Sequence, residues 1–133
     1  MKVYLDANFF IFAAFDATEK GKAARILLKD IVTGKKEART STLALDEVLW
    51  VLRRNGEQQQ MRKNIEQIYA IPHLRIISGS SMIPLRALFY IEQYALKPRD
   101  AFHCAFMEEE NLSLIVTDDA DFDKVKEVKR IVF

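Results

Sequence analysis

The sequence predicts an α/β fold, a three-layer sandwich with a mostly parallel central sheet. Strand-like and helix-like segments alternate along the whole chain, which is the pattern of a parallel sheet covered by helices. Half of the residues are hydrophobic and 29% are charged, as in globular proteins. The 133 residues contain no internal repeat or linker, and this length suits one domain with its own core. We therefore expect a single domain over residues 1–133.

Short β-branched or alternating segments predict the strands, and hydrophobic residues at helical spacing predict the helices between them. The expected strands are residues 2–5, 37–41, 74–78, 112–117 and 130–133. The expected helices are residues 23–32, 42–54, 57–70, 81–94 and 98–110. Start and stop signals accompany them: Gly34, Gly56 and Pro72 at helix ends, Ser81 as a cap, and Pro98 at a first position.

The composition limits the cellular setting. The lone cysteine, Cys104, cannot form a disulfide within the chain, which fits a reducing cytoplasm. The first residues do not have a signal-peptide layout, because Asp6 interrupts the apolar run. The longest apolar stretches, such as residues 9–15, fall far short of the roughly 18 residues that a membrane span needs. We expect a cytoplasmic protein without a membrane segment.

The net charge of +1 gives no support to nucleic-acid binding by the chain as a whole, and does not exclude it. Positive charge is unevenly distributed. Basic residues gather at Lys35-Lys36, Arg53-Arg54, Lys97 with Arg99, and Lys124 to Arg130. Each patch has the ordinary interpretation of a solvated helix end or loop.

Acidic residues follow the ends of two predicted strands. Asp6 comes directly after the first strand, and Asp118, Asp119 and Asp121 follow the strand that ends near Thr117. Sites in open parallel sheets form beyond the carboxyl ends of the strands. Two further acids lie on predicted helices that could face the same crevice, and these are Glu47 and Asp100.

Most of these acids also have structural interpretations. Asp6 could cap the next helix, Asp100 suits the positive end of a helix dipole, and residues 118–123 could form a turn. Glu47 is harder to explain in this way, since its neighbours at helical spacing are apolar and a buried carboxylate needs a partner or a metal. Asp46 points in another direction, where solvent suffices.

The clustering of several acids has an electrostatic cost. At about 5 Å, one like-charge pair costs on the order of 3 kcal/mol at an effective dielectric of roughly 20. A divalent cation removes that cost. Because the proposed ligands are carboxylates without a Cys/His set, Mg²⁺ or Mn²⁺ is favoured over zinc. His103 lies beside Cys104 and Phe106, so we interpret it as a packed, hydrogen-bonded residue.

Four segments together resemble the PIN-domain family, especially the VapC-like toxins of prokaryotic toxin–antitoxin pairs. They are Tyr4-Leu5-Asp6-Ala7-Asn8, Leu45-Asp46-Glu47-Val48-Leu49, Pro98-Arg99-Asp100-Ala101-Phe102-His103, and Val116-Thr117-Asp118-Asp119-Ala120-Asp121-Phe122. Each segment alone is weak, but this order and spacing over nearly the whole chain is specific. The resemblance implies a PIN-like fold.

The resemblance also implies residue roles. It gives Asp6, Glu47, Asp100 and Asp119 to catalysis, and metal ligation to Asp6, Asp100, Asp119 and Asp121. Asn8 and Thr117 match polar positions that would orient the first and last acids, while the spacing leaves Asp118 as a turn residue. Arg99, next to Asp100, is the best candidate for binding RNA phosphates. The aromatic residues available for base recognition have apolar neighbours that predict core or interface positions, and they are Tyr4, Phe9, Phe12 and Trp50.

The activity that the resemblance implies is Mg²⁺- or Mn²⁺-dependent hydrolysis of RNA phosphodiester bonds. It also implies a cognate antitoxin and a homodimer, and the very apolar run at residues 9–12 suits a covered surface. The main alternative is a catalytically inactive PIN module that acts in RNA binding or scaffolding. A haloacid-dehalogenase-type phosphatase would need a second Asp where this chain has Asn8, and a DNA flap nuclease would usually carry large insertions.

Overall fold

The computed structural model describes residues 1–133 and contains one five-stranded sheet in the order β3-β2-β1-β4-β5. All four neighbouring pairs are parallel, so the sheet is parallel throughout. The strands are β1 (Lys2–Leu5), β2 (Glu37–Ser41), β3 (Leu74–Ile77), β4 (Leu114–Val116) and β5 (Lys129–Ile131). The helices are α1 (Ala7–Phe15), α2 (Glu19–Val32), α3 (Thr42–Arg54), α4 (Met61–Tyr69), α5 (Ile83–Tyr94) and α6 (Pro98–Glu109), with short 3₁₀ helices at Gln58–Gln60 and Ala120–Lys124.

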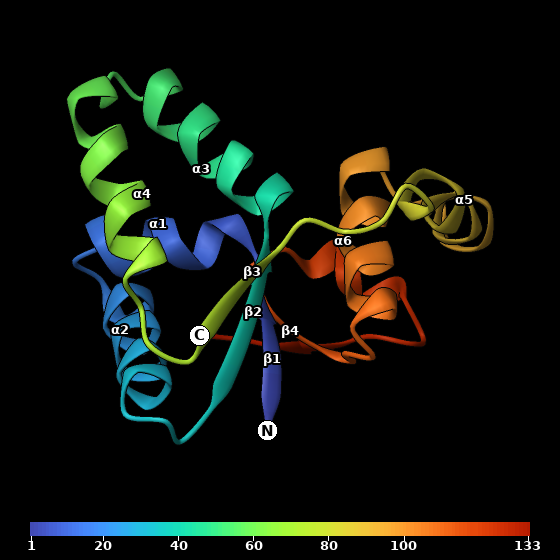
Figure 1. Ribbon diagram of the computed structural model, residues 1–133, viewed down its shortest axis with the longest axis horizontal. Coiled ribbons are helices and arrows are strands. Elements are labelled where there is room, and N and C mark those ends of the chain that lie inside the picture. The colour runs from blue at the N-terminus through green and yellow to red at the C-terminus, as the bar shows by residue number, and fades with distance from the viewer.

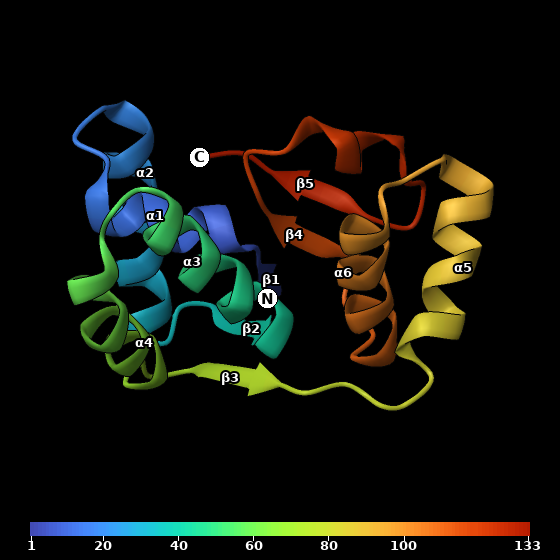
Figure 2. The same ribbon diagram turned by 90° about the horizontal axis from the view of Figure 1, so that it is seen from above.

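The sheet lies between two layers of helices, as Figure 1 and Figure 2 show. Helices α1 to α4 cover one face, and α5 and α6 cover the other. Alternate residues of β1 serve the two layers, because successive side chains of a strand point to opposite faces. Val3 and Leu5 join the core on the α1–α4 side, and Tyr4 joins the core against α6. The predicted three-layer α/β sandwich is confirmed.

Several predicted boundaries are corrected by the structure. The helix expected from residue 23 begins earlier, at Glu19. Hydrophobic spacing does not reveal its first turn, because that turn is largely exposed and lacks an apolar pattern. The helix expected over 57–70 begins with a 3₁₀ turn, and only Met61–Tyr69 is α-helical. The expected cap Ser81 is wrong, since the Ser80 hydroxyl instead accepts a hydrogen bond from the Met82 N–H.

The apolar run at residues 9–12 is mostly explained by the core. Phe9 and Phe10 are buried, and Phe12 packs edge-on against Phe133. Trp50 is different, because 53% of it is exposed, so a core position for it is wrong. None of the helices is both long and apolar enough to span a membrane.

The strand order places the ends of β1 and β4 side by side at the middle of the sheet. The chain leaves β1 toward β2 on one side, while β4 lies on the other side, so the connections diverge at this point. Such switch points leave a crevice at the carboxyl ends of the strands. Asp6 follows β1 there and Thr117 follows β4, which brings residues 111 positions apart into contact.

Candidate metal centre

Asp6 is fixed by hydrogen bonds to both of its carboxylate oxygens. It caps α1, since Oδ1 accepts a hydrogen bond from the Ala7 N–H at 2.7 Å, and Oδ2 accepts one from the Thr117 hydroxyl at 2.7 Å. Asp6 is also buried. The capping interpretation is therefore correct, and it leaves the carboxylate with lone pairs to spare, because each oxygen can accept more than one bond.

Asn8 and Thr117 connect the first and last acidic segments. The Asn8 side-chain amide donates to Thr117 Oγ1 at 3.0 Å, and its carbonyl oxygen accepts from the Asp118 N–H at 3.2 Å. Thr117 Oγ1 also accepts from the Asp119 N–H at 3.1 Å. With its bond to Asp6, the Thr117 hydroxyl donates once and accepts twice, which is its full capacity. The two residues thus hold the loop after β4 against the end of β1.

Asp100, Asp119 and Asp121 form one acidic group. Each offers a carboxylate oxygen, and these three atoms lie within 4.8 Å of one another. Asp100 lies in the first turn of α6, while Asp119 caps the following 3₁₀ helix by accepting from the Asp121 N–H. Asp118 instead forms an ion pair with Lys20, which agrees with its expected role as a turn residue.

The pKa of Asp100 is raised by its burial and by the negative charge around it. Burial raises this pKa to about 6, and the charges of Asp119, Asp6 and Asp121 add to the increase, while His103 opposes it. The Asp100 carboxylate has neither a hydrogen bond nor an ion pair within the chain. A partly buried acid without a partner, beside other acids, is suited to bind a cation.

Glu47 belongs to a second group, with Asp6 and His103, whose ligand atoms also lie within 4.8 Å of one another. His103 is fully buried, and its Nε2 is hydrogen-bonded to Glu47 Oε1 and lies 3.5 Å from Asp6 Oδ1. Its Nδ1 is 2.6 Å from the Tyr4 hydroxyl, which is 2.7 Å from Ser41 Oγ at the start of α3. The prediction of a packed, hydrogen-bonded His103 is confirmed.

Sequence reasoning missed the chain of polar side chains behind Glu47. The apolar neighbours of Glu47 indicate that this acid needs a partner but do not identify one, and His103 supplies it from α6. Burial alone would lower the pKa of His103, yet the hydrogen bond to Glu47 and the charge of Asp6 outweigh it, so the pKa is raised. Tyr4 and Ser41 complete the chain, and no buried side-chain polar atom is left without a partner.

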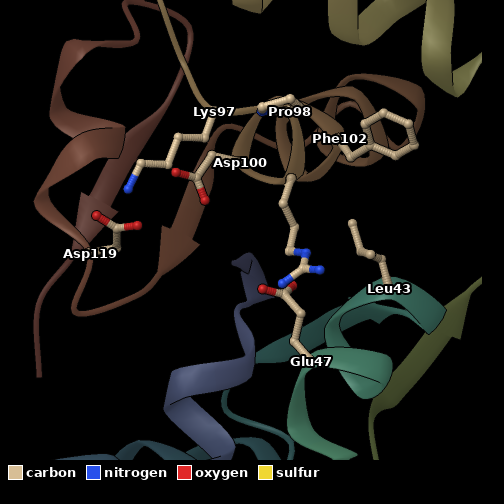
Figure 3. Close-up of a pocket in the computed structure, with 8 residues that line it drawn as sticks. Leu43, Glu47, Lys97, Pro98, Asp100, Phe102 and Asp119 are labelled. Carbon is tan, nitrogen blue, oxygen red and sulfur yellow. The ribbon is translucent and has the colours of Figure 1, made fainter. Parts of the chain in front are cut away.

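Both groups open into one pocket of about 600 Å³ between α3 and the start of α6. It is lined by Leu43, Glu47, Lys97, Pro98, Arg99, Asp100, Phe102 and Asp119. In Figure 3, Glu47 approaches from α3 while Asp100 and Asp119 lie across the pocket, with Lys97 pointing toward Asp119. Carboxylates from distant segments therefore share one solvent-accessible space.

The residues fit a hard divalent cation, but the predicted ligands are divided between two groups. Of the four expected ligands, Asp100, Asp119 and Asp121 lie together, whereas Asp6 lies with Glu47 and His103. The first three are oxygen donors only, as Mg²⁺ and Mn²⁺ prefer. Which residues meet in space follows from helix placement and side-chain conformation, neither of which is visible in residue spacing.

The crowded acids predict a pH dependence for the metal-free chain. Because the pKa of Asp100 is about 6 when folded and near its ordinary 3.8 when unfolded, the folded state retains a proton that the unfolded state has released. The stability that protonated Asp100 contributes is therefore lost as pH rises from 3.8 to about 6. The raised pKa of His103 acts in the same direction at higher pH. Melting temperature in EDTA should fall between about pH 4 and 7.

Added Mn²⁺ should remove much of this decline, because a bound cation favours the ionised folded state. The variant Asp100→Asn should flatten the acidic part of the profile. A melting temperature that rises steadily over this pH range in EDTA would mean that burial and the neighbouring acids do not raise the pKa of Asp100.

An α/β sandwich with acidic groups at the switch point of a parallel sheet is a fold and site class with known members. The family model described as PIN domain matches residues 3–128, and the chain belongs to this family. A comparison with curated protein sequences gives no significant match.

Solved structures show the same fold at low sequence identity. The VapC20 toxin of Mycobacterium tuberculosis, described as cleaving the sarcin-ricin loop, is similar with a TM-score of 0.75 and 15% identity, over 93% of this chain and 95% of that one. DNA-bound VapBC of Salmonella typhimurium has a TM-score of 0.73 and 15% identity, over 99% and 98%. VapBC2 of Rickettsia felis, bound to a promoter DNA fragment, has a TM-score of 0.72 and 17% identity, over 99% and 98%.

Proposed function

We propose that this chain is a metal-dependent endoribonuclease and the toxin of a toxin–antitoxin pair. One observation carries the proposal: Asp100, Asp119 and Asp121 converge beside Glu47 and Asp6 at the carboxyl edge of the sheet, within reach of one pocket. Membership of the PIN family and a fold shared with VapC20 support it.

The acidic groups would hold Mg²⁺ or Mn²⁺, with Asp100, Asp119 and Asp121 as the main ligands and Asp6 nearby. A divalent cation supplies positive charge to a scissile phosphate and makes water more acidic. Glu47, held by His103, would orient the attacking water from the opposite wall of the pocket. Asn8 and Thr117 would keep Asp6 and Asp119 in place through the hydrogen bonds described above.

The rim of the pocket suits the backbone of RNA. Lys97 and Arg99 line it, are exposed, and have no acidic partner within ion-pair distance. Such cations bind phosphates without regard to sequence and would position the strand. The similar structures include toxin–antitoxin complexes, one of them from Klebsiella pneumoniae, so we propose a cognate antitoxin as the protein partner.

We also propose a homodimer of this single domain. Three apolar side chains at helical spacing on α5 are about half exposed or more, and these are Leu85, Leu88 and Phe89. A second copy could cover this face. The same protein would act in the cytoplasm, where its RNA substrate and its antitoxin are present.

The direct test is RNA cleavage under controlled metal supply. The purified chain should cleave RNA in Mg²⁺ or Mn²⁺ and lose that activity in EDTA, and restoring Mn²⁺ should restore cleavage. A DNA strand of the same sequence should be cut far less. Equal cleavage with and without chelator would refute the metal dependence.

The alternative of an inactive binding module makes the opposite prediction. It requires RNA to bind without being cut at any metal concentration. Glu47, Asp100 and Asp119 line one pocket, which favours the enzyme, because a module that only binds phosphate has no use for clustered negative charge.

A further inference from the structure

We infer that Trp50 and Arg54 on α3 form a stacking site for an unpaired base of the RNA, one helical turn beyond Glu47. The inference rests on the proposed ribonuclease function and extends it, since it assigns a base-binding role to a residue outside the acidic centre.

The geometry of α3 connects Trp50 to the acidic pocket. Leu43, Glu47, Trp50 and Arg54 are separated by four, three and four residues, so they follow one side of the helix. Leu43 and Glu47 line the acidic pocket. The same side of the helix therefore continues from the pocket to Trp50, about 4.5 Å further along the helix axis. A strand lying in the pocket would meet the indole next.

The indole of Trp50 is accessible to solvent. Among the aromatic residues considered for base recognition, Tyr4 and Phe9 are fully buried, whereas 53% of Trp50 is exposed. The Arg54 guanidinium lies 4.8 Å from the centre of the indole ring. An exposed aromatic ring with an arginine beside it is the arrangement on which bases of single strands stack.

The residues around Trp50 carry positive charge. A second, smaller pocket of about 370 Å³ is lined by Trp50, Arg53, Arg54 and Gln58, with no acidic residue. Neither arginine forms an ion pair. Trp50 is also the only large hydrophobic residue of α3 that is exposed. An isolated aromatic ring among unpaired cations matches a nucleotide better than the apolar core of a protein interface.

The chain offers a direct probe, because Trp50 is its single tryptophan. Short single-stranded oligo(U) should quench the fluorescence of the Asp100→Asn variant, in which cleavage is expected to be slow. The same strand annealed to its complement should quench much less, since its bases are already stacked. Anisotropy of labelled RNA would report binding independently. Binding without quenching would overturn the inference.

Substitutions of Trp50 distinguish the loss of base stacking from the loss of protein structure. Trp50→Ala should raise KM for single-stranded RNA by about 5- to 160-fold, since stacking contributes about 1–3 kcal/mol per base, with kcat unchanged. Trp50→Phe should retain most of the affinity. Tyr69→Ala, which removes an exposed aromatic residue from α4, is the matched control and should change neither constant.

The outcomes distinguish the two claims. If RNA is cleaved and Trp50→Ala behaves like wild type, the stacking site is wrong and the ribonuclease stands. If single-stranded RNA quenches Trp50 and is never cleaved, the proposed activity fails while the binding site stands. If the emission instead changes with protein concentration alone, this face is covered by a second copy, which overturns the inference.

Discussion

Asp100→Asn is expected to lower the rate of RNA cleavage by about 100- to 1,000-fold, since charge stabilisation at a phosphate is worth several kcal/mol. The amide is isosteric with the carboxylate but neutral, so it is a poor ligand for Mg²⁺ or Mn²⁺. The side chain has no hydrogen bond or ion pair to lose. In the wild-type chain the Asp100 carboxylate is repelled by the charges of Asp119, Asp6 and Asp121. The metal-free variant lacks this repulsion, so it should melt at or above the wild-type temperature.

Single-turnover cleavage of labelled RNA would measure this effect, with melting temperature recorded in EDTA. Asp46→Asn is the matched control, because Asp46 is an exposed acid on α3 that also lacks an ion pair. It should cleave RNA at the wild-type rate. Full activity in Asp100→Asn would remove this residue from the site.

The second large effect concerns stability. His103→Ala should lower the free energy of unfolding by about 3–5 kcal/mol, because it creates a cavity and leaves buried polar groups unpaired. The ring is fully buried and joins Tyr4 to Glu47 across the interior. Tyr4→Phe keeps the aromatic ring and removes only the hydroxyl, so it should cost about 1–2 kcal/mol.

Urea denaturation in the presence of EDTA would compare the three proteins. A graded loss, larger for His103→Ala than for Tyr4→Phe, would indicate that His103 is the structural link behind Glu47. A His103→Ala variant as stable as the wild-type chain would show that the hydrogen-bond chain contributes little to folding.

The fold was largely predictable because its signals are local. The strands at 2–5 and 37–41 and the helix at 42–54 have the predicted bounds, since apolar patterning and the Asn55-Gly56 stop act within a few residues. The strand expected at 112–117 is shorter, because the Leu112 N–H bonds back to Met107 at the end of α6. That contact depends on helix geometry and has no signature in the apolar pattern.

The candidate site was predictable only in part. The acids that follow β1 and β4 could be recognised, because the ends of parallel strands meet at one edge. The division of acids into two groups could not, since it depends on side-chain directions across the crevice. The bond between Glu47 and His103 joins residues 56 positions apart on two helices, and local spacing has no information about such a contact.

Calorimetric titration of Mn²⁺ into the metal-free chain tests most directly whether the clustered carboxylates hold a divalent cation. We expect saturable binding by the wild-type chain and by Asp46→Asn, and a large loss of affinity in Asp100→Asn. Absence of saturable binding in the wild-type chain, or equal affinity in all three proteins, would contradict the assignment of this pocket as a metal centre.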